Sequence, residues 1–224
     1  NAKMLSKEVA TTLGGRFFIY DAYPYSFREY LAAQQVNLEQ HWMYDTVQRS
    51  QVKRHLNDYF YYGGLPEILS FQNKRSMLSS LYQKIYLGDI CARNNIKSDR
   101  VLNILIKKMA ESVKQPLSFN RLKNVIVATG APISVPTTID YVDYASDSWL
   151  ILPMENEVGK LTEKEMQKKY YFVDNGLLNL FLMNSETSLL ENMVAVELCR
   201  RFGKNNVFFL NAEKEIDFIV PDQK

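Results

Sequence analysis

Two capped helical segments followed by two strand-like runs are the feature of this sequence that most limits its fold. Ser118 precedes an apolar helical pattern that ends at Gly130, and Ser134 precedes a second pattern with Pro136 in its first turn. Serine side chains accept hydrogen bonds from the free N–H groups of a helix start, and proline is tolerated there because it has no N–H. "SWLILPM" and "KYYFVD" then predict two strands joined by the polar loop "ENEVGKLTEKEMQK".

The order helix, turn, helix, hairpin is typical of a winged helix-turn-helix, a fold that usually binds DNA. In this sequence the second helix bears only acidic charges, namely Asp140, Asp143 and Asp147, and Glu155 and Glu157 follow it. No lysine or arginine occurs between Lys123 and Lys160. Because a duplex attracts basic and repels acidic side chains, we expect a winged-helix-like unit over residues 116–182 that contacts protein, and nucleic acid is disfavoured as its partner.

Residues 41–115 have helical periodicity throughout. "VQRSQVKRHLNDYFYYGGLPEIL" predicts a helix that stops at Gly63-Gly64, and "RSMLSSLYQKIYLGDICARNNI" predicts the next. A third helix follows in "DRVLNILIKKMAESV", with Asp99 as its N-cap. Asp89 and Arg93 lie four residues apart, the spacing of an ion pair along a helix.

The first 40 residues predict the edge of a parallel α/β domain. "NAKMLSKEVATTLGG" has the apolar spacing of a helix, and "RFFIYD" predicts a buried strand. "SFREYLAAQQ" predicts another helix, with Ser26 as N-cap and Glu29 completing a capping box.

Composition limits the class of protein. With 224 residues, of which 46% are hydrophobic and 23% charged, the chain predicts a globular protein, and a net charge of +2 gives no overall attraction to nucleic acid or membrane. Cys91 and Cys199 lie far apart with no metal-ligand spacing, so we expect free thiols. The apolar runs are far shorter than the roughly 18 residues of a membrane span, which predicts a cytoplasmic protein with no membrane partner.

Two carboxylates near the C-terminus interrupt an apolar run. In "NAEKEIDFIVPDQK", the period of a strand places Glu215 and Asp217 on one face and Ile216, Phe218 and Val220 on the other. This pattern predicts either a polar strand face or half of a metal site.

Several blocks of the sequence, taken in order, carry a family resemblance. These are "YYGGLPEIL", "YLGDICARNNI", "LSFNRLKNVIVATGAPISVPTTIDYVDYASDSWLI", "KKYYFVDNGLLNLF" and "LLENMVAVEL" with "EIDFIV". They resemble the bacterial and archaeal AAA-type ATPases that carry a conserved C-terminal domain of unknown function. The resemblance covers nearly the whole chain and implies that residues 1–40 are the end of a P-loop ATPase domain.

The same resemblance implies roles for residues near a nucleotide. Asn1 would lie beside the nucleotide's sensor position, Arg16 would match the family's Gly-Arg pair, and Arg93 would face an ATPase interface. The sequence has no GxxxxGK[ST] phosphate loop. ATP and Mg²⁺ are therefore implied as cofactors of an intact parent protein, and none is expected for this chain alone.

The C-terminal block is similar to the PD-(D/E)XK nuclease fold, in which acidic side chains hold Mg²⁺. By that resemblance Glu191 matches the helix acid, with Glu197 as an alternate, and Asp217 matches the strand acid. The acid-x-Lys pair of the fold would begin where this sequence ends, so residues 183–224 would be an incomplete nuclease-like segment. The simpler alternatives are that Glu191 interacts with its helix dipole and that the strand acids form a solvated face.

Together these patterns predict a mostly helical α+β chain: the end of an ATPase domain, a helical region, a winged-helix-like unit and the start of a nuclease-like domain. The predicted function is the regulatory and effector part of a AAA-type ATPase, coupling nucleotide state to a protein partner or to its own ATPase domain. The alternatives are a Mg²⁺-dependent nuclease whose last motif lies beyond Lys224 and a winged-helix DNA-binding regulator.

Overall fold

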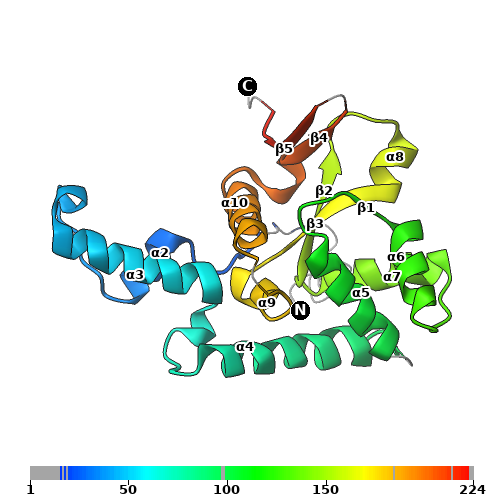
Figure 1. Cartoon of the computed structure of the whole chain (residues 1–224), viewed down its shortest axis with the longest axis horizontal. Coiled ribbons are helices and arrows are strands. Elements are labelled where there is room, and N and C mark those ends of the chain that lie inside the picture. The colour runs from blue at the N-terminus through cyan, green and yellow to red at the C-terminus, as the bar shows by residue number, and fades with distance from the viewer. Residues whose placement is uncertain are drawn as a thin grey trace.

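The computed structural model describes residues 16, 18, 20–96, 99–183, 185–212 and 214–221. These residues form an α+β structure in which helices surround one mixed sheet and a helical arm extends from its side (Figure 1). The strands lie in the order β1-β3-β2-β4-β5. Their bounds are Leu117–Ser118 for β1, Ile151–Asn156 for β2, Gln167–Phe172 for β3, Phe208–Asn211 for β4 and Glu215–Ile219 for β5.

The arm consists of α2 (Phe27–Ala33), a 3₁₀ turn (Trp42–Tyr44) and α3 (Thr46–Tyr62). The predicted capping box of α2 is confirmed, because the Glu29 N–H donates to Ser26 Oγ at 3.3 Å and the Ser26 N–H donates to Glu29 Oε2 at 2.7 Å. The rings of Tyr30 and Tyr59 pack edge to face, with centroids 5.4 Å apart, and join α2 to α3.

Two helical segments follow the arm, one that lies below α9 (Asn175–Asn179) and one that rises towards β3 (Figure 1). The first is α4 (Lys74–Gln83), which continues as a π-helix (Lys84–Ala92), and the second is α5 (Asp99–Glu111). The prediction of Asp99 as an N-cap is wrong, because Asp99 is already the first residue of α5. Its carboxylate still interacts favourably with the positive end of the helix dipole.

The capped helices predicted between Ser118 and Asp147 are present as α6 (Phe119–Ala128) and α7 (Val135–Asp147). Ser118 Oγ accepts from the Arg121 N–H at 3.2 Å, and Ser134 Oγ accepts from the Thr137 N–H at 3.2 Å. β2 and β3 then pair antiparallel, but the segment predicted as a polar loop between them contains the helix α8 (Leu161–Met166). The Lys160 N–H donates to Glu163 Oε2 at 3.0 Å and satisfies the start of that helix.

The last part of the chain joins the same sheet. After α9 (Asn175–Asn179) and α10 (Glu186–Phe202), a short 3₁₀ turn (Lys204–Asn206) leads into β4, which pairs parallel with β2. β5 then pairs antiparallel with β4. The sheet therefore continues across residue 183, the position where the sequence predicts a new domain.

The N-terminal predictions are only partly within the described residues. The helix predicted over residues 1–15 lies outside them. The strand predicted for residues 16–21 is wrong where it is described, since Arg16, Phe18, Tyr20 and Asp21 are irregular and Phe18 and Tyr20 are 90% and 88% exposed. A strand needs a neighbour to pair its backbone, and no strand of the described ranges lies beside this segment.

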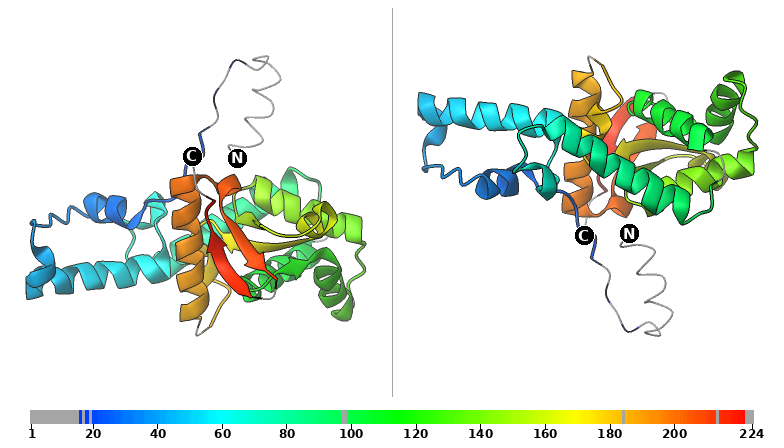
Figure 2. Two further views of the ribbon diagram at one scale, coloured as in Figure 1. Left: turned by 90° about the horizontal axis from the view of Figure 1, so that it is seen from above. Right: turned by 90° about the horizontal axis from the view of Figure 1, so that it is seen from below.

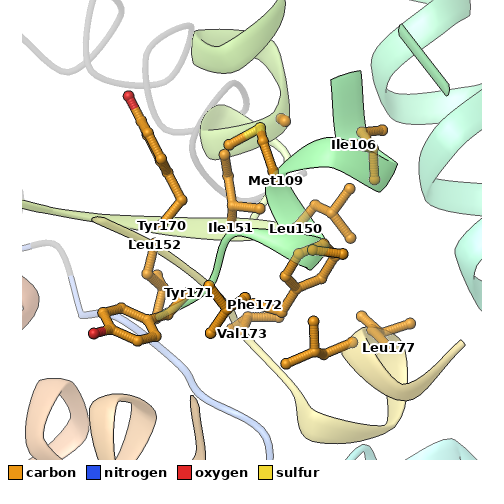
Figure 3. Packing of buried hydrophobic residues seen from close by; sticks show 14 of the residues in the cluster. Ile106, Met109, Leu150, Ile151, Leu152, Tyr170, Tyr171, Phe172, Val173 and Leu177 are labelled. Atoms are coloured by element: carbon orange, nitrogen blue, oxygen red, sulfur yellow. The ribbon is translucent and has the colours of Figure 1, made fainter. Parts of the chain in front are cut away.

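The core is densest around the two central strands (Figure 3). Tyr170 and Phe172 of β3 and Leu152 of β2 are almost fully buried, which requires cover on both faces of the sheet. α5 supplies Ile106 and Met109 to this cluster, and α9 supplies further leucines.

Asp174, two residues after the end of β3, joins the C-terminal end of α3 to the start of α9 and forms a buried clamp between them. Its carboxylate is buried and accepts hydrogen bonds from the backbone N–H groups of Gly64 at 2.8 Å, Gly176 at 2.8 Å and Leu177 at 3.3 Å. Burial raises the pKa of Asp174 to about 6, against the opposing effect of the backbone N–H groups. Gly63, with φ of +77°, ends α3 as predicted and brings the chain against this carboxylate.

Two buried asparagines extend this clamp. The Asn175 side chain donates to the carbonyls of Phe60 and Leu189, each at 3.0 Å. Asn192 of α10 accepts from the Phe172 N–H at 2.7 Å and donates to the Phe172 carbonyl at 3.0 Å and to Asn175 Oδ1 at 2.9 Å. Every polar atom of both side chains is thus paired, and the network ties α3, β3, α9 and α10 together.

We predict that Gly64→Ala lowers the free energy of unfolding by about 2–3 kcal/mol, because a Cβ at residue 64 would lie 2.3 Å from the Tyr25 carbonyl oxygen. The matched control is Gly88→Ala, where a Cβ meets nothing within 4 Å. Since Gly88 lies within a helix, the control is expected to leave stability unchanged or to raise it by up to about 1 kcal/mol. Urea denaturation measures both, and equal losses in the two variants would contradict the close approach at Gly64.

Candidate carboxylate-lysine site

Three carboxylates meet at one buried ammonium group. Lys169 of β3 is fully buried, and its Nζ lies 2.9 Å from Asp217 Oδ1. The same atom lies 3.4 Å from Glu191 Oε1 and 3.4 Å from Glu215 Oε1. The Tyr171 hydroxyl completes the cluster by donating to Glu191 Oε1 at 2.9 Å.

The backbone explains why these groups converge. Lys169 and Tyr171 are alternate residues of β3 and therefore share one face of the strand. Glu191 comes from α10, which lies beside the β4–β5 hairpin (Figure 2). The Lys169 ammonium lies 5.6 Å from the centroid of the Phe209 ring in β4, and beyond it β5 presents Glu215 and Asp217.

A β-bulge changes the predicted alternation of β5. Phe208 pairs with Ile219 and Leu210 with Ile216, so one residue of β4 lies opposite two residues of β5. Glu215 and Asp217 both reach Lys169, as their predicted common face requires. Phe218, predicted for the opposite face, instead packs on Tyr171 with ring centroids 5.7 Å apart, because the extra residue interrupts the period of two.

The cluster holds its lysine in the charged form. Burial alone would lower the pKa of Lys169, but the hydrogen bond to Asp217 and the charges of Glu191, Asp217 and Glu215 outweigh it and raise that pKa above its usual value. Burial and the Glu191 charge also raise the pKa of Tyr171, so its hydroxyl remains a donor. Lys169 thus serves as the cation among these carboxylates, and no group of metal-ligand side chains in the described ranges is arranged to hold an ion.

The structure places Glu191 and Asp217, the candidate nuclease acids, on the same lysine. That they bind Mg²⁺ stays a prediction. The sequence did not identify Lys169 as their partner, although a charged residue sharing a strand face with Tyr171 inside "KKYYFVD" is a signal for a buried ion pair.

The other candidates lie elsewhere. Glu197, the alternate helix acid, pairs with Arg200 and, at 2.6 Å, with Arg201, because six residues of helix turn it to a different face from Glu191. Arg93 pairs with Asp89 at 3.9 Å, which confirms the expected ion pair. Arg16 is exposed in an irregular segment, and Asn1 lies outside the described residues, so all three nucleotide roles stay predictions.

Two further expectations can be compared with the structure. Cys91 and Cys199 are free thiols, as predicted. Within the described part of the chain, no helix has both the length and the apolar character needed to cross a bilayer.

The fold and site define an α+β protein whose sheet carries a lysine enclosed by carboxylates from a helix and an edge strand. The chain belongs to the family of the domain of unknown function DUF8612, whose model matches residues 53–188. The matched region contains Lys169 and Tyr171 and ends before Glu191.

Two relatives show the extent of the similarity. An uncharacterised protein of Methanocaldococcus jannaschii is 29% identical over 98% of this chain and 51% of its own length. An uncharacterised protein of Haemophilus influenzae is 31% identical over 98% of this chain and 54% of its own length. The chain therefore spans about half the length of these relatives. No solved structure matches it.

We predict that Lys169→Met lowers the free energy of unfolding by about 1–3 kcal/mol, because it leaves Glu191 and the two strand acids without their common cation. The same variant should bind Mn²⁺ at least about tenfold more tightly than the wild type, since the three carboxylates are then no longer paired with the ammonium group and can close around a metal ion. Calorimetric titration and denaturation with and without Mn²⁺ measure the two effects.

Lys168→Met is the matched control, because Lys168 pairs with Glu155 at 3.0 Å and Glu165 at 3.1 Å, away from this cluster. It should leave Mn²⁺ binding unchanged. Equal Mn²⁺ affinity of the Lys169 variant and the wild type would mean that the lysine does not occupy a cation position.

Proposed function

We propose that this chain is the regulatory and effector part of a AAA-type ATPase and couples the nucleotide state of a P-loop domain to a protein partner. The observation that carries the proposal is the position of Lys169. The acids that resemble nuclease ligands are already paired with one buried lysine of the same chain, so this cluster is suited to hold the β4–β5 hairpin against α10. Metal-dependent hydrolysis of nucleic acid at these acids would instead need a metal ion with an open coordination position.

The clamp around Asp174 supplies a physical route for the coupling. It joins the end of α3, the helix of the arm that follows the ATPase-like residues 1–40, to β3 and α10 through buried and partly buried hydrogen bonds. A displacement of α3 would strain this network, since an unpaired buried polar group costs about 1–3 kcal/mol. The network therefore favours transmission of a change at the arm into the sheet.

The charge of α7 supports a protein partner over DNA. Asp140 and Asp143 are exposed on this helix, the position of the recognition helix in a winged-helix unit. Such a surface repels phosphates. A DNA-binding regulator is therefore the weaker function for the same unit.

We predict that changing Asp140, Asp143 and Asp147 together to Asn leaves any weak DNA binding unchanged or makes it tighter. The reason is that the variant removes negative charge from a surface that contributes nothing favourable to a polyanion. Fluorescence anisotropy with a labelled duplex measures the effect. Weaker DNA binding by the triple variant would show that α7 contacts the duplex.

The central test compares this chain with its parent protein. Alone, the chain should show no ATP turnover and no ATP binding in the micromolar range, because it has no phosphate loop. In the parent, hydrogen exchange of the amides of Gly64, Gly176 and Leu177 should differ between a non-hydrolysable ATP analogue and ADP, because these N–H groups bind Asp174. Identical exchange in the two nucleotide states would contradict the coupling.

A Mg²⁺-dependent nuclease is the second candidate, favoured by the convergence of Glu191, Glu215 and Asp217 from α10 and β5. This chain alone should not cleave DNA with Mg²⁺ or Mn²⁺. Cleavage by the parent that disappears in Asp217→Asn but persists in Glu197→Gln would favour the nuclease, because only Asp217 belongs to the cluster.

A further inference from the structure

An apolar groove lies where the arm meets α10. It has a volume of about 1000 Å³, and among the described residues its lining comes from α2, α3, α10 and the cap residue of α2. Apolar side chains dominate its lining: Phe27, Leu56, Met193, Val194, Leu198 and Phe202. Figure 2 shows the arm extending from one side of α10.

The groove continues onto an exposed stripe of α10. Leu190 is 52% exposed and Val194 is 37% exposed, and their spacing of four residues places them on one face of the helix. Leu56 on the facing helix is 39% exposed. Apolar surface of this kind on two neighbouring helices is typical of a site that receives another helix.

The rim of the groove is basic. Arg28 of α2 and Arg201 of α10 border it. On α3, Lys53 and Arg49 precede Leu56 by three and seven residues, which places them along the same face. Arg28, Arg49 and Lys53 have no ion-pair partner within the described ranges of the chain.

Acidic groups offset only part of this charge. Among the described lining residues the one carboxylate is Glu197, which is shared by Arg200 and Arg201. The stretch of α3 from residue 46 to residue 57 contains three basic residues and no acid. The opening therefore complements a negatively charged ligand, whereas its floor complements an apolar one.

We propose that this groove binds an amphipathic helix of a partner protein, with an apolar face directed into the groove and acidic residues along its flanks. A helix is favoured over an extended peptide because, in the part of the chain that the structure describes, helices and no strand edge line the groove. A protein is favoured over nucleic acid because four apolar lining residues, Leu56, Met193, Val194 and Leu198, are aliphatic and outnumber the three aromatic rings on which bases could stack. The inference rests on the proposed coupling function only in assigning the groove to a regulatory partner.

The test uses the chain with synthetic peptides of about 18 residues, which form about five helical turns. The first peptide has leucines at i, i+3, i+4 and i+7 with glutamates elsewhere, the second has lysine in place of each glutamate, and the third is a scramble of the first. The first should bind with a dissociation constant of about 1–100 µM by fluorescence anisotropy. The other two should bind at least about tenfold more weakly, and added salt should weaken the first.

Two variants separate the charged and apolar contributions. Arg28→Glu combined with Lys53→Glu should weaken binding of the acidic peptide about tenfold or more, and Val194→Asp should do so independently. Lys107→Glu, a charge reversal at an exposed position of α5, is the matched control and should leave binding unchanged. Circular dichroism checks that all variants remain folded.

Equal binding of the acidic, basic and scrambled peptides would overturn the proposal, as would binding unaffected by both groove variants. Single-stranded DNA that displaces the acidic peptide from this groove would assign it to nucleic acid. Self-association abolished by Val194→Asp, seen by sedimentation, would assign it to a second copy of the chain. The peptide test contains no nucleotide, and the hydrogen-exchange test of the parent contains no peptide. Failure of the peptide to bind therefore does not affect the exchange test, and the two proposals can fail separately.

Discussion

The buried hydrogen bonds of Asp174, Asn175 and Asn192 are the constraint on which the rest of the structure depends. Asn192 fixes α10 against β3, and Asn175 joins both to the end of α3. Leaving any one of these buried groups unpaired would cost about 1–3 kcal/mol, so the four elements keep one relative arrangement. The exclusion of a Cβ at Gly63 has the same origin, since that atom would lie 2.0 Å from Asp174 Oδ1.

The orientation of α10 connects this network to both surface features. With Asn192 held toward β3, Glu191 reaches Lys169, while Met193 and Val194 line the groove beside the arm. Successive helical residues differ by about 100° in direction, so one buried anchor determines what its neighbours face. The carboxylate-lysine cluster and the groove are therefore separate sites that both depend on the position of Asn192. A displacement of α10 would alter both.

Local signals in the sequence predicted much of the helical structure. Ser26, Ser118 and Ser134 were correctly assigned as helix caps, because a cap depends on a hydroxyl and an N–H a few residues away. The stop at Gly63 follows from local backbone geometry in the same way. α8 was missed because its short segment is polar and exposed, so no apolar periodicity marks it.

The candidate site was only partly predictable. Glu191 and Asp217 were selected by resemblance, but the lysine that joins them lies 22 and 48 residues away in the sequence. The bulge in β5 could not be predicted from the sequence either, because the alternation of polar and apolar side chains gives no sign of an extra residue.

By itself the sequence determined the α+β class, most of the helices and their caps, and the acidic character of α7, because these depend on contacts within a few residues or on composition. Only the tertiary structure decided that Lys169 is the cation of the carboxylate cluster, that Asp174 joins two distant helix ends, and that a basic-rimmed groove opens beside α10. Each of these depends on groups that packing brings together from separate elements. The number of residues between such groups along the chain does not determine their distance in space.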